Sequence, residues 1–147
     1  MAPTLTSNTA IFGPVFALAA WTVAILLRVA FVRIGGATRG TVSPGDFSLG
    51  ESAAVPPAIA LPNRAYMNLL ELPLLFYVVC VITYVTATTT NVVLALAWLY
   101  VALRAVHTLV HLLYNNVLHR LIAFAASNVV LVAIWIVVGA ALYARTS

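Results

Sequence analysis

The amino-acid sequence predicts an all-α integral membrane protein, built as a single four-helix transmembrane bundle. Of its 147 residues, 64% are hydrophobic and only 7% are charged, whereas a soluble domain is about one quarter charged. Four apolar stretches each exceed the roughly 20 residues that a helix needs to cross the hydrocarbon layer. These stretches do not alternate polar with apolar residues, as the strands of a membrane barrel do. We therefore expect helices in a lipid bilayer.

The predicted helices are separated by three polar segments. They cover residues 11–34, 64–85, 91–114 and 117–143. Gly35 begins a loop over residues 35–62 that is rich in glycine and proline, and Asn63 is the expected cap of the second helix. The second turn ends at Thr90 or Asn91, either of which would cap the third helix, and Asn115-Asn116 is either a tight turn or a soft point in the third helix.

The charges predict the orientation of the bundle. The formal net charge is +4, and all seven basic residues are arginines. The first and third loops share one side of the membrane, which holds Arg33, Arg39, Arg64 and Arg120, while the other side holds Arg145 alone. Basic residues accumulate in cytoplasmic loops, so both termini are expected outside. The arginines form no cluster of the kind that binds nucleic acid, so no nucleic-acid partner is expected.

The second predicted helix carries three polar residues on one face. Arg64, Asn68 and Glu71 follow each other at spacings of four and three, which places them within an arc of about 60°. Ionisable groups inside a membrane span are candidates for function by default. The alternative is a structural ion pair that fixes helix packing.

The third predicted helix carries a matching polar face. Arg104, His107, His111 and Tyr114 lie within an arc of about 100°. A charge at the depth of Arg104 needs a counter-ion. Glu71 is the acid that the predicted spans offer, so an ion pair between Glu71 and Arg104 is expected.

A metal site is the weaker interpretation of these histidines. His107 and His111 stand four residues apart, a spacing that holds a metal from one helix face. A third ligand would have to come from His119 or Glu71, which requires a particular alignment of helices. We expect no metal, because most such histidines only form hydrogen bonds.

Together these residues resemble a known family. Arg64, Asn68 and Glu71, followed by Pro73, look like the second-helix motif of the MAPEG family, the membrane-associated proteins in eicosanoid and glutathione metabolism. The stretch from Arg104 to Arg120 is similar to the family's Arg-x-x-Tyr-x-x-x-Tyr stretch, with the two histidines at the tyrosine positions. The resemblance covers most of the chain and is closest to uncharacterised bacterial members.

The resemblance implies a homotrimer that binds glutathione, as a co-substrate, between neighbouring subunits near the cytoplasmic face. The implied substrate-binding residues are Arg64, Asn68, Glu71, Arg104, His107, His111 and Tyr114. Arg120 is the implied catalytic residue, which would activate the thiol. A bacterial inner membrane is the expected location.

Three functions remain open on the sequence. The first is transfer of glutathione to lipophilic electrophiles, or reduction of lipid peroxides, by a microsomal-type glutathione transferase or peroxidase. The second is a non-catalytic protein that binds a lipid between subunits. The third is a structural membrane protein whose polar faces only hold a trimer together. Fold alone does not decide among them.

Overall fold

The computed structural model describes residues 7–145 and consists of helices. Four stretches are long and apolar enough to cross a membrane, which confirms the predicted fold class. A short 3-10 helix, η1 (Asn8–Ile11), precedes the long helices, and a second, η2 (Pro44–Phe47), lies in the first loop. The α-helices are α1 (Phe12–Thr38), α2 (Pro57–Leu70), α3 (Pro73–Val85), α4 (Asn91–Leu113) and α5 (Val117–Tyr143).

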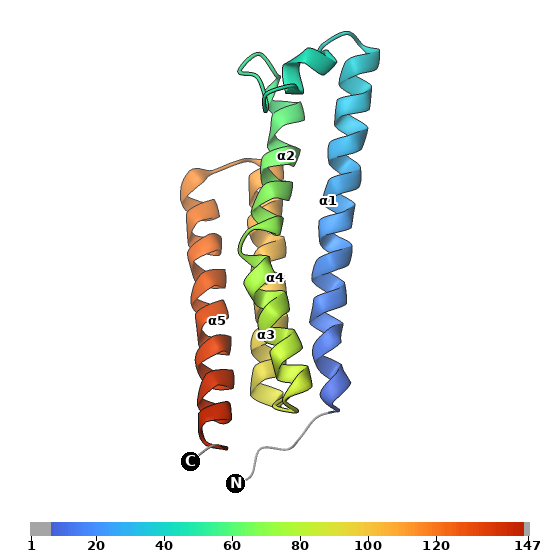
Figure 1. Cartoon of the computed structure of the whole chain (residues 1–147). Coiled ribbons are helices and arrows are strands. Elements are labelled where there is room, and N and C mark those ends of the chain that lie inside the picture. The colour runs from blue at the N-terminus through green and yellow to red at the C-terminus, as the bar shows by residue number, and fades with distance from the viewer. Residues whose placement is uncertain (1–6, 146–147) are drawn as a thin grey trace.

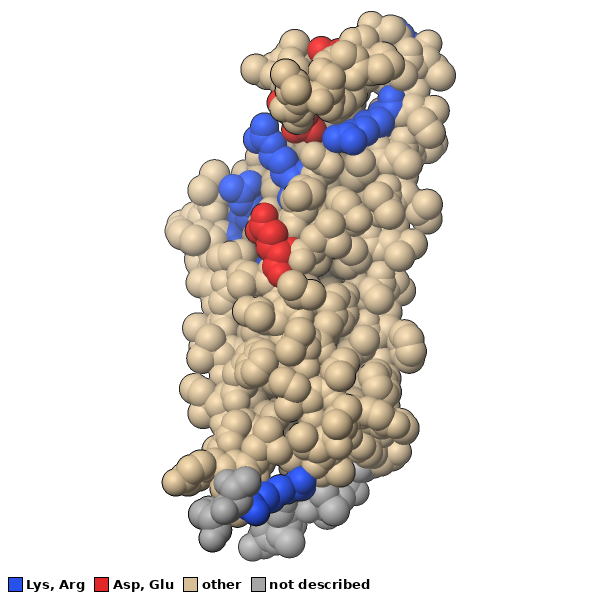
Figure 2. All heavy atoms as spheres, in the orientation of Figure 1, with Lys and Arg blue, Asp and Glu red and all other residues tan. Residues whose placement is uncertain are grey.

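The helices run side by side, and their connections alternate between the two ends of the bundle (Figure 1). The α1–α2 loop and the α4–α5 turn lie at one end, and the start of η1 and the end of α5 lie with the α3–α4 turn at the other. We call the first of these the loop-one end. Basic and acidic side chains gather towards this end, whereas the middle of the visible face is almost free of them (Figure 2). The alternation places the first and third loops together, as the sequence predicts.

The first loop is shorter than the sequence predicts, because both flanking helices extend into it. Gly35 and Gly36 do not end α1, which continues to Thr38. The expected cap at Asn63 is wrong, because α2 begins at Pro57 with its proline ring in the first turn. Proline suits that position, since its fixed φ matches a helix and the first turn needs no donor. The loop therefore covers residues 39–56.

The second membrane stretch is broken near its middle. It was expected as one helix over residues 64–85, but α2 ends at Leu70, and Glu71 leaves the helical region with φ −72° and ψ −89°. Pro73 has no N–H for the carbonyl four residues earlier, so the ladder cannot continue. Instead, the N–H of Leu74 donates to the carbonyl of Glu71 at 3.2 Å. The face predicted from one continuous helix therefore stops at this break.

The two later turns use the expected capping chemistry. The Thr90 hydroxyl accepts a hydrogen bond from the N–H of Val93 at 3.2 Å and begins α4. The Asn116 amide oxygen accepts from the N–H groups of Leu118 and His119 and begins α5. Such caps satisfy donors that a helix start leaves free. They fix where α4 and α5 begin, which positions the functional residues described below.

The apolar core lies between the helices and becomes polar towards the loop-one end. Phe76 of α3 stacks on Tyr100 of α4 with ring centroids 4.6 Å apart. Leu18 of α1 and Ile134 of α5 are also buried in this core. The hydroxyl of Tyr100 accepts a hydrogen bond from Arg104, as described below. The core thus supports one wall of the polar region.

The close approach of α1 and α2 depends on a glycine. A Cβ at Gly36 would lie 2.6 Å from Cδ1 of Ile59 and 3.0 Å from Cγ2 of Val42, whereas a Cβ at Gly35 would meet nothing within 4 Å. Gly35→Ala is expected to stabilise the protein by up to about 1 kcal/mol, through helix propensity. Gly36→Ala should instead destabilise the protein, because overpacking costs about 1–3 kcal/mol, which exceeds the gain in helix propensity. Thermal unfolding followed by circular dichroism measures both. Equal stability of the two variants would contradict the close contact.

Candidate functional site

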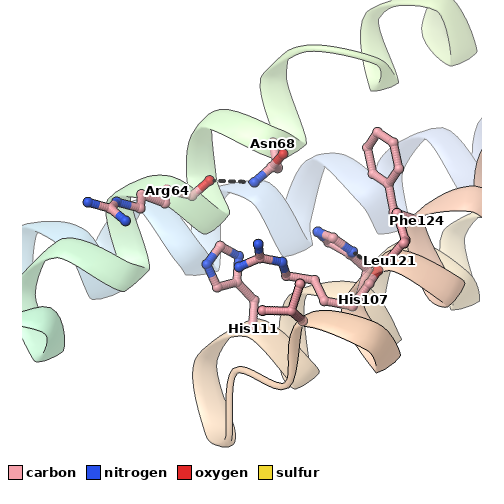
Figure 3. A pocket seen from close by; sticks show the side chains of 8 residues that line it. Arg64, Asn68, His107, His111, Leu121 and Phe124 are labelled. Carbon is pink, nitrogen blue, oxygen red and sulfur yellow. Dashed lines mark hydrogen bonds between the residues drawn. The ribbon is translucent and has the colours of Figure 1, made fainter.

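A pocket of about 350 Å³ opens near the loop-one end, between α2, α4 and the start of α5. It is lined by five polar and three apolar residues: Arg64, Asn68, His107, His111, Arg120, Val117, Leu121 and Phe124. No carboxylate stands among these lining residues. Figure 3 shows the two histidine rings on one side and the α2 residues on the other. The pocket thus joins the two polar faces that the sequence predicts, and it favours an anionic or electron-rich ligand.

The histidines are buried and only partly satisfied. His107 is 4% exposed and His111 is 2% exposed. Nδ1 of His107 lies 3.0 Å from the backbone carbonyl oxygen of Arg120. Nε2 of His107 and both ring nitrogens of His111 are buried without a hydrogen-bond partner among the described residues. Buried polar atoms are rarely left unpaired in native proteins, so these nitrogens point to a ligand or water in the pocket.

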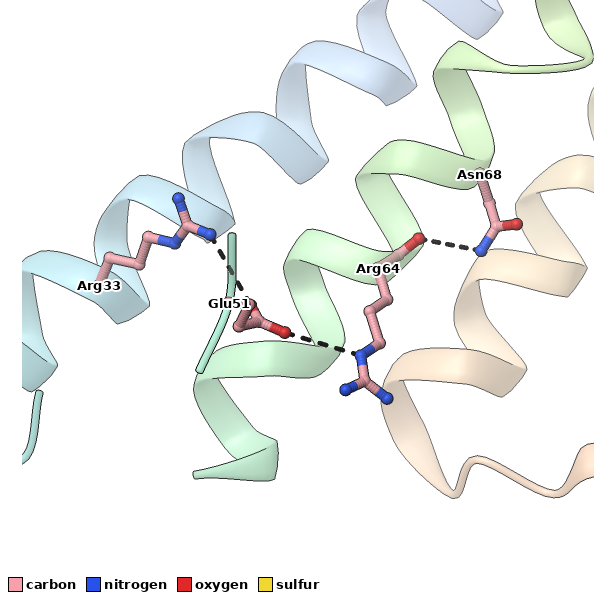
Figure 4. A network of polar contacts seen from close by, with 4 residues as sticks. All are labelled: Arg33, Glu51, Arg64 and Asn68. Atoms are coloured by element: carbon pink, nitrogen blue, oxygen red, sulfur yellow. Dashed lines mark hydrogen bonds and ion pairs between the residues drawn. The ribbon is translucent and has the colours of Figure 1, made fainter. Parts of the chain in front are cut away.

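Arg64 is tied to the first loop through an acid that connects two helices. The Glu51 carboxylate lies 3.6 Å from Nε of Arg64 on α2 and 3.7 Å from Nη2 of Arg33 on α1. The Glu51 side chain is 12% exposed, whereas that of Arg64 is 67% exposed. Figure 4 shows Glu51 between the two guanidinium groups. Glu51 therefore orients Arg64 at the edge of the pocket and joins α1 to α2.

Arg120 enters the pocket from the first turns of α5. Its Nη1 donates to Oδ1 of Asn115 at 2.9 Å. Asn115 has φ 46°, a left-handed conformation that asparagine adopts more readily than most residues. The α4–α5 turn thus places the amide oxygen where it holds the guanidinium. Arg120 also supplies the backbone carbonyl that faces His107. It therefore contributes both its side chain and its backbone to the site.

Arg104 lies behind the pocket and is completely buried, with 0% exposure. Its Nε donates to the Tyr100 hydroxyl at 3.1 Å. The guanidinium carbon lies 5.5 Å from the ring centres of both Tyr100 and Phe124. Nη1 and Nη2 have no hydrogen-bond partner within residues 7–145. Phe124 therefore separates a buried positive charge from the pocket that it lines.

The arrangement combines two arginines, an amide and two imidazoles in a cavity at the end of a membrane bundle. A family model described as the MAPEG family matches residues 11–140 of this chain. The chain belongs to the MAPEG family. Searches of curated proteins and of solved structures found no match. The family includes glutathione-dependent enzymes, and membership confirms the resemblance inferred from the second and third helices.

Three residues implied by the MAPEG resemblance, Glu71, Arg104 and Tyr114, do not line this pocket. The expected ion pair between Glu71 and Arg104 is wrong within the chain: the ion pairs of the described residues join Glu51 to Arg33 and to Arg64. Glu71 is exposed, because the break before Pro73 ends the helical spacing. Tyr114 is also exposed, follows the last residue of α4, and contacts Nδ1 of His119 at 3.0 Å.

Other residues of this MAPEG site were not found from the sequence. Phe124, Val117 and Leu121 line the pocket but look like ordinary membrane-facing residues in an apolar stretch. Glu51 lies in a loop, where no periodicity relates it to Arg64. Tyr100 could have been identified from the sequence, because it stands four residues before Arg104 on the same helix face. A polar partner for Arg104 could therefore have been sought on its own helix.

A metal centre is not supported by the described part of the chain. Between residues 7 and 145, no group of three or more His, Cys, Asp or Glu side chains could hold a metal ion. His119 bonds to Tyr114 on the exposed surface, away from the lining of the pocket. Cys80 is buried in the core formed with α1, α4 and α5.

Glu51→Gln should weaken both the fold and the position of Arg64. The substitution leaves two guanidinium groups without their shared carboxylate, and Glu51 is largely buried while both arginines reach water. We expect a loss of about 1–2 kcal/mol in the free energy of unfolding, between the values for surface and buried pairs. Thermal unfolding in mild detergent measures it. Asp46→Asn is the control, because Asp46 accepts only local bonds from Ser43 in the same loop. Equal losses would contradict the bridge.

Proposed function

We propose that this MAPEG protein binds glutathione at the loop-one end and transfers it to lipophilic electrophiles, or uses it to reduce lipid peroxides. The observation that carries the proposal is the convergence of Arg64, Asn68, His107, His111 and Arg120 on one pocket without a lining carboxylate. Family membership supports the same ligand. At about 350 Å³ the pocket falls in the range of small-molecule sites, about 300–1,000 Å³.

The lining residues fit the chemistry of a carboxylate-bearing thiol. Arg64 and Asn68 lie on the α2 side and bind a carboxylate of glutathione through charge-assisted and neutral hydrogen bonds. Arg120 lies on the α5 side and stabilises the thiolate. A free cysteine thiol has a pKa of about 8.5, so only a few per cent is ionised at pH 7. A guanidinium next to the sulfur raises this fraction and therefore the rate of attack.

Assembly as a homotrimer is part of the proposal, and Glu71 supports an interface. Glu71 stands at the helix break inside the membrane stretch Pro57–Val85, and it is exposed on the isolated chain. It takes part in neither of the ion pairs found between residues 7 and 145. A carboxylate that faces lipid is costly, so it needs a neighbouring protein surface or water. A second subunit packed at this face supplies the neighbouring protein surface.

The orientation follows from the arginine distribution. Arg33, Arg39, Arg64 and Arg120 lie in or near the α1–α2 loop and the α4–α5 turn, at the loop-one end, and Arg145 follows α5 at the other end. The positive-inside rule places the loop-one end in the cytoplasm and the termini outside. Cytoplasmic glutathione then reaches the polar lining from the aqueous side. The electrophile enters from the membrane, along Val117 and Leu121 at the pocket wall.

Glutathione binding to the purified protein in mild detergent tests the proposal. Equilibrium dialysis with radiolabelled glutathione should give saturable binding. Arg64→Ala should weaken binding by about 10-fold or more, the equivalent of one charged hydrogen bond. Arg39→Ala is the matched control, because Arg39 is exposed at the same end and does not line the pocket. Equal affinity of the two variants would place the ligand elsewhere.

The same preparation distinguishes the alternative functions. Native mass spectrometry should show three subunits and bound glutathione. A phospholipid that glutathione does not displace would favour the lipid-binding protein. A trimer that binds neither would favour the structural protein. A monomer with intact helicity that still binds glutathione would contradict the proposed interface at Glu71.

A further inference from the structure

The ring of His107 is held in one tautomer by the start of α5. Its Nδ1 lies 3.0 Å from the backbone carbonyl oxygen of Arg120. A carbonyl oxygen only accepts hydrogen bonds, so Nδ1 must carry the hydrogen and donate it. The remaining lone pair of the neutral ring then resides on Nε2. His111, one turn further along α4, has no such contact, because both of its ring nitrogens are without a partner among the described residues.

The Nε2 atom of His107 is therefore a proton acceptor without a hydrogen-bond donor among the described residues. It is buried and has no hydrogen-bond partner in the described chain, and His107 is a lining residue of the pocket. The rings of Phe124 and His111 pack against the His107 ring, with their centroids 5.7 Å and 6.2 Å from its centroid. An unfilled acceptor in the wall of a pocket that binds a thiol is suited to take the thiol proton.

The charged groups around the two histidine rings are basic. Arg104 on α4, Arg120 on α5 and Arg64 on α2 are the charged groups facing the two histidines from the elements packed there. No carboxylate lines the pocket to favour an imidazolium. A thiolate formed in the pocket changes this balance, because its negative charge lies beside the ring. Proton transfer from sulfur to nitrogen thus creates an ion pair from two groups that were both neutral before.

We propose that His107 is the general base of the reaction and that it returns the same proton to the product. This rests on the proposed glutathione function, and the step is written here for a lipophilic conjugated carbonyl compound as the electrophile. The S–H bond of glutathione breaks and its proton moves to Nε2, while the electron pair stays on sulfur beside Arg120. The thiolate forms a C–S bond to the β-carbon, and the carbon–carbon π pair moves towards the carbonyl. The Nε2 proton then passes to the resulting enolate.

This cycle needs no further reactant. One thiol and one conjugated carbonyl compound give one thioether, and His107 ends neutral with its proton on Nδ1 unchanged. The bond from Nδ1 to the Arg120 carbonyl is kept throughout, and it strengthens while the ring is charged. The α4–α5 turn, which fixes Arg120, therefore controls both the sulfur and its proton acceptor.

The test compares rates and pH profiles of purified variants in detergent. The reaction is glutathione addition to trans-4-phenyl-3-buten-2-one, a lipophilic conjugated ketone. His107→Gln is expected to lower kcat/KM at pH 7 by about 10²-fold or more, the usual contribution of a general base. The deficit should shrink as the pH rises, because the thiol then ionises without help. In His107→Gly, added imidazole should restore part of the rate, which a purely structural role would not allow.

The controls separate the role of His107 from folding and from the proposed function. His119→Gln should match the wild type, because His119 lies outside the pocket lining. Circular dichroism and glutathione binding should be retained in His107→Gln. A folded, glutathione-binding variant with the wild-type rate and pH profile would overturn the role of His107 alone. A wild-type protein that neither binds nor conjugates glutathione would overturn the proposed function and this inference with it.

Discussion

Arg120→Ala is expected to lower kcat/KM for glutathione conjugation by about 10²–10³-fold, the usual loss when one donor to a developing anion is removed. Arg120 lines the pocket and is held there by Asn115. Its guanidinium interacts more strongly with the thiolate than with the thiol. The loss should therefore fall mainly on kcat, with a smaller rise in KM. Steady-state kinetics in detergent micelles measure both parameters.

Two further variants define what Arg120 supplies. Arg120→Lys keeps the charge but not the fork of donors, so it should retain part of the rate. Asn115→Gly removes the amide that holds Nη1 while tolerating φ 46°. It should lower the rate less than Arg120→Ala, because the guanidinium stays but is less well oriented. A full rate in Arg120→Ala would place thiol activation on another group.

Arg104→Met is expected to raise the free energy of unfolding by about 1–4 kcal/mol, by analogy with buried ion pairs that are replaced by apolar residues of similar volume. Arg104 is 0% exposed, and two of its nitrogens have no hydrogen-bond partner in the described chain. The hydrogen bond to Tyr100 and the two aromatic rings offset only part of the cost of burying the charge. Thermal unfolding in detergent gives the difference.

The direction of this effect separates two accounts of Arg104. An ion pair with Glu71 would make any neutral substitution at Arg104 strongly destabilising. The buried and unpaired guanidinium predicts the opposite sign. Arg104→Lys serves as the control, because it keeps a charge while losing the Nε contact, and it should not stabilise the protein. A lower melting temperature for Arg104→Met would reveal a counter-ion supplied by another molecule.

The fold could be predicted because it depends on local and one-dimensional properties. The length and hydropathy of each apolar stretch determine whether it spans the bilayer, and no long-range contact is needed for that inference. Thr90 and Asn116 could be identified as caps, or as parts of turns, from their chemistry alone. The start of α2 was missed because the proline at its first position was interpreted as part of a loop. Proline in fact suits a helix start.

The site could be predicted only where one helix continues without interruption. Helical spacing correctly placed Arg64 with Asn68, and His107 with His111. It failed at Glu71 and Tyr114, because each lies just beyond the last helical residue of its element. It also failed at Arg104, whose guanidinium is buried against Tyr100 and Phe124 and does not line the pocket. The contact of Glu51 with Arg64 is tertiary, and no pattern in the sequence relates a loop residue to a helix face. Periodicity therefore predicts faces, whereas helix ends and loops decide which residues share a site.

The break between α2 and α3 divides the second membrane stretch into two mechanical parts. A continuous helix would act as a rod, so that a tilt at one end moves the other end by a similar angle. Here the chain leaves the helical conformation at Glu71, and Leu74 bonds to the Glu71 carbonyl instead of continuing the regular ladder. The lower segment, α3, stays packed through Phe76 and Val79 in the core. The other segment, α2, is held separately, through Ala65 and Leu69 in the same core and through the contact of Arg64 with Glu51, so its orientation is set by its own neighbours and not by a continuous helix running into α3.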